Sequence, residues 1–72
     1  MRMAEQLSVG DAPINLTQVL KLAGWVLNGG EAKALIAEGM VRVNGEIEYR
    51  KRRKMIKGDE VRLEDGPWLR LV

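Results

Sequence analysis

Hydrophobic residues recur at helical spacing in a first segment, residues 16–23. Asn15 precedes this segment as a candidate N-cap, and Gln18 follows three residues later in the position of a capping box. Gly24 is typical of the residue at which a helix ends. The hydrophobic positions of the segment are Leu16, Val19, Leu20 and Ala23. The pattern predicts one short helix of about two turns.

A second helix is predicted between the turn at Asn28-Gly29-Gly30 and Gly39. Glu31 falls in its first turn, where the helix dipole favours an anion. Its buried face would hold Ala32, Leu35 and Ile36. The open turn before this helix also carries backbone N–H groups that could bind a phosphate.

Beyond the helices the hydrophobic period changes to two, which is typical of strands. Residues 40–43 and 46–48 alternate on either side of Asn44-Gly45, a strong signal for a two-residue type I′ turn. The inner face of this hairpin is expected to hold Val41, Val43 and Ile47.

A second hairpin is predicted from residues 60–64 and 69–71 around Asp65-Gly66-Pro67, and residues 5–9 suit a short edge strand. We therefore expect an α+β fold, with two short helices packed on one side of a small twisted antiparallel sheet. The 72 residues are enough for one domain, residues 1–72 with a core at 14–64.

Basic residues are concentrated in one short window between two turn signals. Six of the twelve Lys and Arg residues lie there, namely Arg50, Lys51, Arg52, Arg53, Lys54 and Lys57. The acidic residues are scattered, so the net charge of +2 hides this cluster. Because flanking strands would hold the window in place, it differs from a disordered basic tail. Nucleic acid is the partner that most directly offsets the self-repulsion of such a cluster, through counterion release.

Arginine can grip a phosphate with two hydrogen bonds, so Arg50, Arg52 and Arg53 are the first candidates for such contacts. In an extended segment Arg50, Arg52 and Lys54 would share one face, and Lys51 and Arg53 the other. The neighbouring Tyr49 could stack on an unpaired base, although a strand aromatic more often packs within the protein.

The composition gives little support for catalysis or for the binding of a cofactor or metal. The chain has no Cys and no His, which excludes disulfides and the usual zinc sites. Its acidic pairs are sequence neighbours at turns rather than convergent carboxylates. No segment has the length of a membrane span or the apolar core of a secretory signal. We expect a non-catalytic, cytoplasmic binding module without cofactor or metal.

Four segments in combination indicate a family. They are residues 16–21, residues 31–36, the block EGMVRVNGE at residues 38–46 and the block KGDEV at residues 57–61. Together they resemble the S4-type RNA-binding domain, also called the αL motif, and the whole chain is similar to small free-standing bacterial proteins of this type. The resemblance implies that the two helices and the basic segment form one RNA-facing surface. It also implies that Lys21, Lys33 and Arg42 occupy positions of phosphate-contacting cations.

Two functions from different classes follow. The first is binding of structured RNA, such as ribosomal RNA or tRNA, by a ribosome-associated monomer that uses phosphate and shape contacts. The second is an adaptor whose basic surface docks on an acidic protein. The arginine content of the basic window favours RNA.

Overall fold

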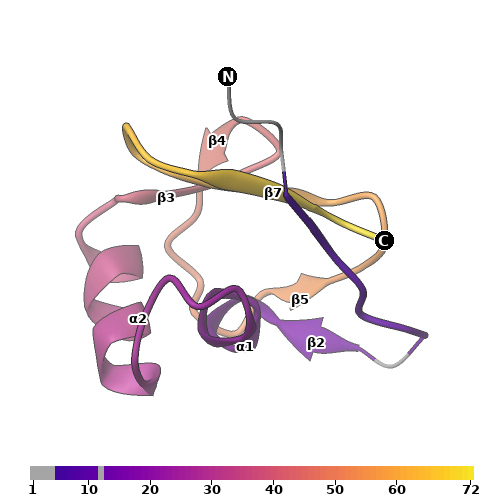
Figure 1. Ribbon diagram of the computed structural model, residues 1–72. Coiled ribbons are helices and arrows are strands. Elements are labelled where there is room, and N and C mark those ends of the chain that lie inside the picture. Colours follow the sequence, from indigo (N-terminus) through magenta and orange to yellow (C-terminus); the bar gives the residue numbers. More distant parts are fainter. Residues whose placement is uncertain (1–4, 12) are drawn as a thin grey trace.

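The computed structural model describes residues 5–11 and 13–72. Residues 1–4 and 12 of the expected 1–72 domain lie outside the described residues. In chain order the elements are β1 (Glu5–Leu7), β2 (Ile14–Asn15), α1 (Leu16–Leu22), α2 (Gly29–Ala37), β3 (Val41–Val43), β4 (Glu46–Ile47), β5 (Lys54–Met55), β6 (Glu60–Leu63) and β7 (Trp68–Leu71). Figure 1 shows both helices on the same side of the larger sheet, with β2 and β5 beside α1. The expected α+β fold is confirmed.

The larger sheet has the strand order β1-β7-β6-β3-β4, and β2 and β5 form a separate antiparallel pair. Both predicted hairpins are present, β3–β4 and β6–β7. The sheet differs from the expected antiparallel one in a single pairing, because β1 runs parallel to β7. The sheet is therefore mixed.

The prediction that Ile47 faces the core is wrong. Ile47 pairs directly with Arg42, and cross-strand partners project to the same face of a sheet. Val41 and Val43 are buried, so Arg42 between them points to the outer face and Ile47 lies there with it, 40% exposed.

The start of α1 is fixed by the predicted capping box. The side-chain oxygen of Asn15 accepts the backbone N–H of Gln18 at 2.9 Å, and the Gln18 side chain accepts the N–H of Asn15 at 3.0 Å. After Ala23, Gly24 adopts a φ of +76° and ends the helix as predicted. These local signals set the bounds of α1, and its buried residues Leu16, Val19 and Leu20 pack in the core.

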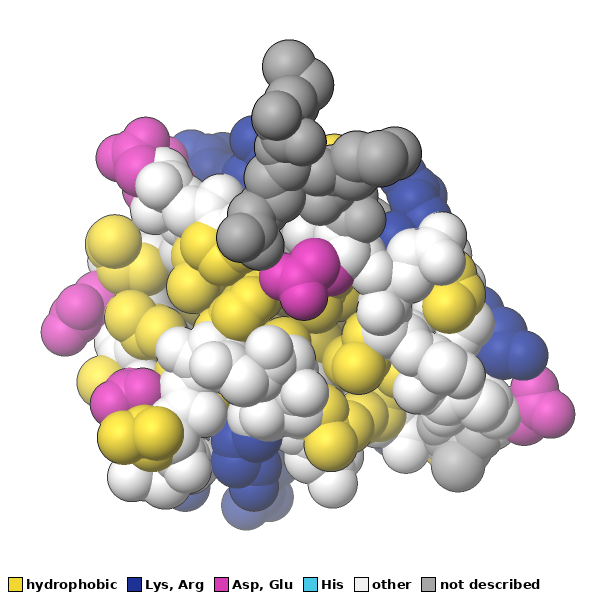
Figure 2. Space-filling model, viewed as in Figure 1, with side chains coloured by type: hydrophobic (Ala, Val, Ile, Leu, Met, Phe, Trp, Pro, Cys, Tyr) yellow, Lys and Arg dark blue, Asp and Glu magenta, His cyan; other side chains and the backbone are white. Residues whose placement is uncertain are grey.

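The core lies between the sheet and the helices, and Figure 2 shows hydrophobic side chains between these two layers. Full burial of one Leu or Ile side chain stabilises a fold by about 1.5–3 kcal/mol. The buried hydrophobic residues are Leu16, Val19, Leu20, Val26, Ala32, Ile36, Val41, Val43, Met55, Val61, Leu69 and Leu71. They come from both helices and the segment between them, from both hairpins and from β5, so the core joins the basic window to the rest of the domain. Within the described part of the chain, no helix is long and apolar enough to cross a membrane.

The turn between β3 and β4 generates the first prediction. Gly45 has a φ of +89°, and a Cβ there would meet open space, so strain alone opposes a side chain. Gly45→Ala is expected to lower the free energy of unfolding by about 1–2 kcal/mol in urea denaturation. Gly29→Ala is the matched control, because Gly29 has no positive φ and its added Cβ would make only an ordinary contact with Thr17. An equal loss in both variants would contradict this account of the turn.

Candidate nucleic-acid interface

The basic loop, residues 50–54, is a turn followed by a short strand. The N–H of Arg53 donates to the carbonyl of Arg50 at 3.1 Å, and only Lys54 at the end of the loop belongs to a strand. The prediction of an extended segment with alternating faces is therefore wrong. Carboxylates and backbone groups outside the loop hold Arg50, Lys51 and Arg53 in this turn.

Backbone groups at the start of α1 hold the basic loop. The N–H of Leu16 donates to the carbonyl of Arg53 at 2.9 Å, and the N–H of Thr17 to the carbonyl of Lys51 at 3.3 Å. The Thr17 hydroxyl donates to the same Lys51 carbonyl at 2.7 Å. N–H groups in a first helical turn have no partner within the helix, so the loop satisfies them while being positioned by them. The sequence carried no signal for the role of Thr17.

Glu48 forms ion pairs with two of the three candidate arginines, Arg50 and Arg53. Its carboxylate accepts two hydrogen bonds from the Arg50 guanidinium, at 2.9 and 3.0 Å, and pairs with Arg53 at 3.0 Å. The hydrogen bond from the Arg50 side chain is the main cause that lowers the pKa of Glu48, and the nearby charge of Arg53 adds to it while burial opposes. Arg52 is thus left as the arginine of the loop that forms no ion pair with a described residue.

Asp59 ties the basic loop to the β3–β4 turn. Its buried carboxylate accepts the N–H of Ile56 at 2.9 Å and the side-chain amide of Asn44 at 3.1 Å, and it lies 3.5 Å from Arg53. Burial is the largest influence on the pKa of Asp59 and would raise it, but the hydrogen bonds from Ile56 and Asn44 and the charge of Arg53 together lower it. Arg53, with a side chain only 25% exposed, is consequently held inside this network.

Cations from three elements converge on two adjoining surface hollows. The smaller, of about 280 Å³, lies between α1, α2 and the loop, and is lined by Asn15, Thr17, Gln18, Lys21, Gly29, Lys33, Lys51 and Arg52. The larger, of about 530 Å³, is lined by Lys33, Ile36, Ala37, Tyr49, Arg50, Lys51 and Arg52. Lys33, Lys51 and Arg52 line both, and no described carboxylate lines either.

A third hollow, beside Arg50, Arg52, Arg53 and Lys54, extends this region along the loop. We call Lys21, Lys33, Arg50, Lys51, Arg52 and Lys54 the basic surface. Figure 2 shows Lys and Arg side chains projecting from the lower edge of the molecule, beneath α1.

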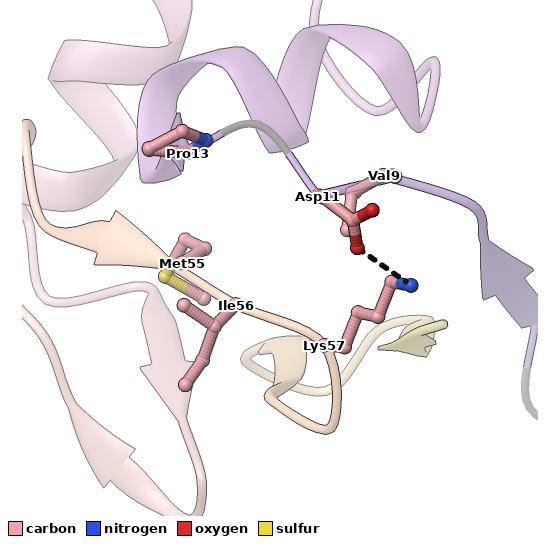
Figure 3. A pocket seen from close by; sticks show the side chains of 7 residues that line it. Val9, Asp11, Pro13, Met55, Ile56 and Lys57 are labelled. Carbon is pink, nitrogen blue, oxygen red and sulfur yellow. Dashed lines mark ion pairs between the residues drawn. The ribbon is translucent and has the colours of Figure 1, made fainter.

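Three predicted site residues are not part of the basic surface: Arg53, which is held in the Asp59 network, and Arg42 and Lys57, which lie elsewhere. Arg42 is on the outer face of the sheet, where its guanidinium pairs with Glu64 at 3.0 Å and donates to the carbonyl of Gly45. Lys57 points to Asp11, with the two charged groups 3.2 Å apart, across a separate hollow that Met55 and Ile56 help to line (Figure 3). The structure therefore does not bring Arg42 or Lys57 to the basic surface.

The turn before α2 is partly occupied by its own side chains. Asn28 caps the helix by accepting the N–H of Glu31 at 2.9 Å, and the Glu31 carboxylate accepts the N–H of Leu27 at 3.0 Å. Gly29 nevertheless borders the smaller hollow. Within residues 5–11 and 13–72 no group of three or more acidic side chains could hold a metal ion.

Comparison with known proteins identifies the family. The S4 domain model matches residues 7–69, so the chain belongs to the S4 domain family. This confirms the resemblance noted in the sequence.

Individual relatives cover most of the chain. YbcJ of Escherichia coli (strain K12) is 47% identical over 55 residues, which are 75% of this chain and 79% of YbcJ. RlbA of Bacillus subtilis (strain 168), named "Probable ribosome maturation protein", is 42% identical over 62 residues, 86% of this chain and 87% of RlbA. The solution structure of YbcJ from E. coli superposes with a TM-score of 0.76 at 40% identity, covering 100% of this chain and 91% of that one. It is described as revealing an ALFAL (αL) motif "involved in RNA-binding".

The Asp59 network makes stability dependent on pH. Because the pKa of Asp59 is lower in the folded chain than in the unfolded one, its contribution is present above the ordinary Asp pKa of about 3.9 and is lost as the pH falls below it. Asp59→Asn is expected to lower the free energy of unfolding at neutral pH by about 1–3 kcal/mol and to flatten its decline in acid. Urea denaturation at a series of pH values measures both effects.

Glu46→Gln is the control for this variant, because Glu46 is exposed and forms no ion pair within the described part of the chain. It should leave the pH dependence of wild type almost unchanged. An acid profile of Asp59→Asn identical to that of wild type would exclude Asp59 as a source of the dependence.

Proposed function

We propose that this chain binds structured RNA, such as ribosomal RNA or tRNA, through phosphate contacts made by the basic surface. The observation that carries the proposal is the convergence of Lys21, Lys33, Lys51 and Arg52 on joined hollows without a described carboxylate. A duplex of RNA hides its bases in a deep, narrow major groove and presents its phosphates and 2′-hydroxyls. A small rigid surface of cations can therefore contact the phosphates of such an RNA, whereas it cannot read the sequence of the bases.

The distribution of ion pairs supports the same assignment. Arg50, Arg53, Lys57 and Arg42 have carboxylate partners, whereas Lys21, Lys33, Lys51, Arg52 and Lys54 form no ion pair with a described residue. An unpaired surface cation loses less on contact with a phosphate, because no internal partner must be given up. Arg52 lines all three hollows of the region and is therefore proposed as its central residue.

The relatives support a place on the ribosome. YbcJ carries a motif described as involved in RNA binding, and RlbA is named for ribosome maturation. We infer that this chain acts without catalysis, as a monomer in the cytoplasm, and contacts RNA of a ribosomal subunit or of its assembly intermediates. The positions of Arg50, Lys51, Arg52 and Lys54 would orient the domain on the RNA backbone.

Binding should depend steeply on salt. If about four to six phosphates are neutralised, the logarithm of the affinity for a structured RNA should fall against the logarithm of the salt concentration with a slope of about −3 to −5. Arg52→Ala should lower the affinity for several structured RNAs to the same degree and make the slope shallower by about one unit. Fluorescence anisotropy over a salt series measures both.

Arg62→Ala is the matched control. It removes the same charge from an exposed arginine on the sheet, which lies over the Trp68 ring at 5.6 Å from its centroid and away from the basic surface. It should leave the slope nearly unchanged. A slope near zero for wild type would exclude the electrostatic model, and binding of an acidic polypeptide as tightly as RNA at equal salt would favour the protein adaptor.

A further inference from the structure

Tyr49 is an aromatic residue left exposed inside the basic region. Its side chain is 63% exposed, and it lines the larger hollow together with Lys33, Lys51 and Arg52. Of the three aromatic residues in the chain, Trp25 packs on the core and Trp68 lies beneath Arg62. Tyr49 is the one whose apolar ring remains largely in contact with water.

The ring of Tyr49 is positioned by the glycine that follows α2. Its hydroxyl oxygen lies 3.1 Å, and its nearest ring carbons 3.6 Å, from the place where a Cβ of Gly39 would be. The missing side chain at Gly39 therefore lets the hydroxyl end of the ring rest against the backbone. The ring is braced at this end while the remainder borders the hollow.

An exposed, braced aromatic ring among cations is the combination that binds unpaired bases. Bases that leave a helix stack on aromatic side chains, and this stacking tolerates any base because each has a π-face. The cations beside the ring, Lys51 and Arg52, belong to the basic loop that begins directly after Tyr49, so one short segment offers both a stacking surface and phosphate ligands. A hollow of about 530 Å³ next to the ring is large enough to admit part of a nucleotide.

We propose that Tyr49 stacks on an unpaired base of the bound RNA while Lys51 and Arg52 hold adjacent phosphates. The inference rests on the proposed function and specifies which kind of structured RNA the chain binds. The preferred RNA is a helix interrupted by a bulge or closed by a loop, rather than a continuous duplex. Base identity is not read at this position, because stacking alone carries no hydrogen-bond pattern.

The test compares two RNA duplexes of equal length, each annealed from two separate strands, one with a single-nucleotide bulge and one fully paired. Wild type should bind the bulged RNA more tightly by anisotropy at fixed salt. Tyr49→Ala should reduce the affinity for the bulged RNA by about tenfold, the usual order for loss of one stacking partner, and leave the affinity for the fully paired duplex unchanged. Tyr49→Phe should retain wild-type preference, because it keeps the ring.

The salt slope separates this inference from the proposed function. Tyr49→Ala removes no charge, so its salt slope should equal that of wild type. Arg52→Ala should instead lower the affinity for both RNAs and make the slope shallower. Equal binding of both RNAs by wild type and Tyr49→Ala would overturn the stacking inference and leave phosphate binding intact. Failure of wild type to bind either RNA at low salt would overturn the proposed function itself.

A second measurement on wild type does not depend on the folding of Tyr49→Ala. Proton NMR of the bulged RNA should show an upfield ring-current shift of the bulged base on binding wild type and Tyr49→Phe. The absence of that shift with bound wild type would overturn the inference.

Discussion

The hydrogen bonds from the first turn of α1 to the basic loop are the contacts on which the rest of the surface depends. A helix must find partners for its first N–H groups, and here the carbonyls of Lys51 and Arg53 supply two of them. The loop thereby becomes part of the helix end. Its cations are fixed relative to Lys21 on α1, and through the packing of α1 against α2 relative to Lys33 as well.

Two carboxylates explain how so many cations can be held so close together. Glu48 and Asp59 form ion pairs with the guanidinium groups of Arg50 and Arg53, and their negative charges lower the electrostatic repulsion among the cations of the loop. The cations that are left unpaired, Arg52 among them, point to the hollows. Arg53, 25% exposed, therefore holds the loop from inside, whereas Arg52 and the 74% exposed side chain of Arg50 remain available to a ligand.

Much of this arrangement could be predicted from the sequence because its signals are local. The capping box of Asn15 and Gln18 and the turn at Asn44-Gly45 depend on a few adjacent residues, and both formed as predicted. A two-residue turn at Asn44-Gly45 also pairs Ile47 with Arg42. The sequence therefore already implied that Ile47 lies on the outer face of the sheet.

The other features depend on contacts distant in sequence. Arg52 and Arg53 are chemically identical and adjacent, and the folded positions of Glu48 and Asp59, which both pair with Arg53, distinguish them. The parallel pairing of β1 with β7 likewise has no local signature, because β1 carries no mark of its partner. The contact of Thr17 with Lys51 joins residues 34 positions apart. For the candidate site, the sequence located the cations but could not divide them into paired and unpaired groups.

The parallel pairing of β1 has a consequence for association between molecules. β7 would otherwise form the edge of the larger sheet, with unpaired N–H and C=O groups beside the alternating apolar side chains Leu69 and Leu71. β1 covers this edge with only three residues, Glu5–Leu7, assisted by backbone hydrogen bonds of Val72 with Leu7 and Val9. Detachment of so short a strand would expose β7 as a template on which a strand of a second molecule could add. Attached β1 presents an edge of only three residues instead, which limits edge-to-edge aggregation of this domain.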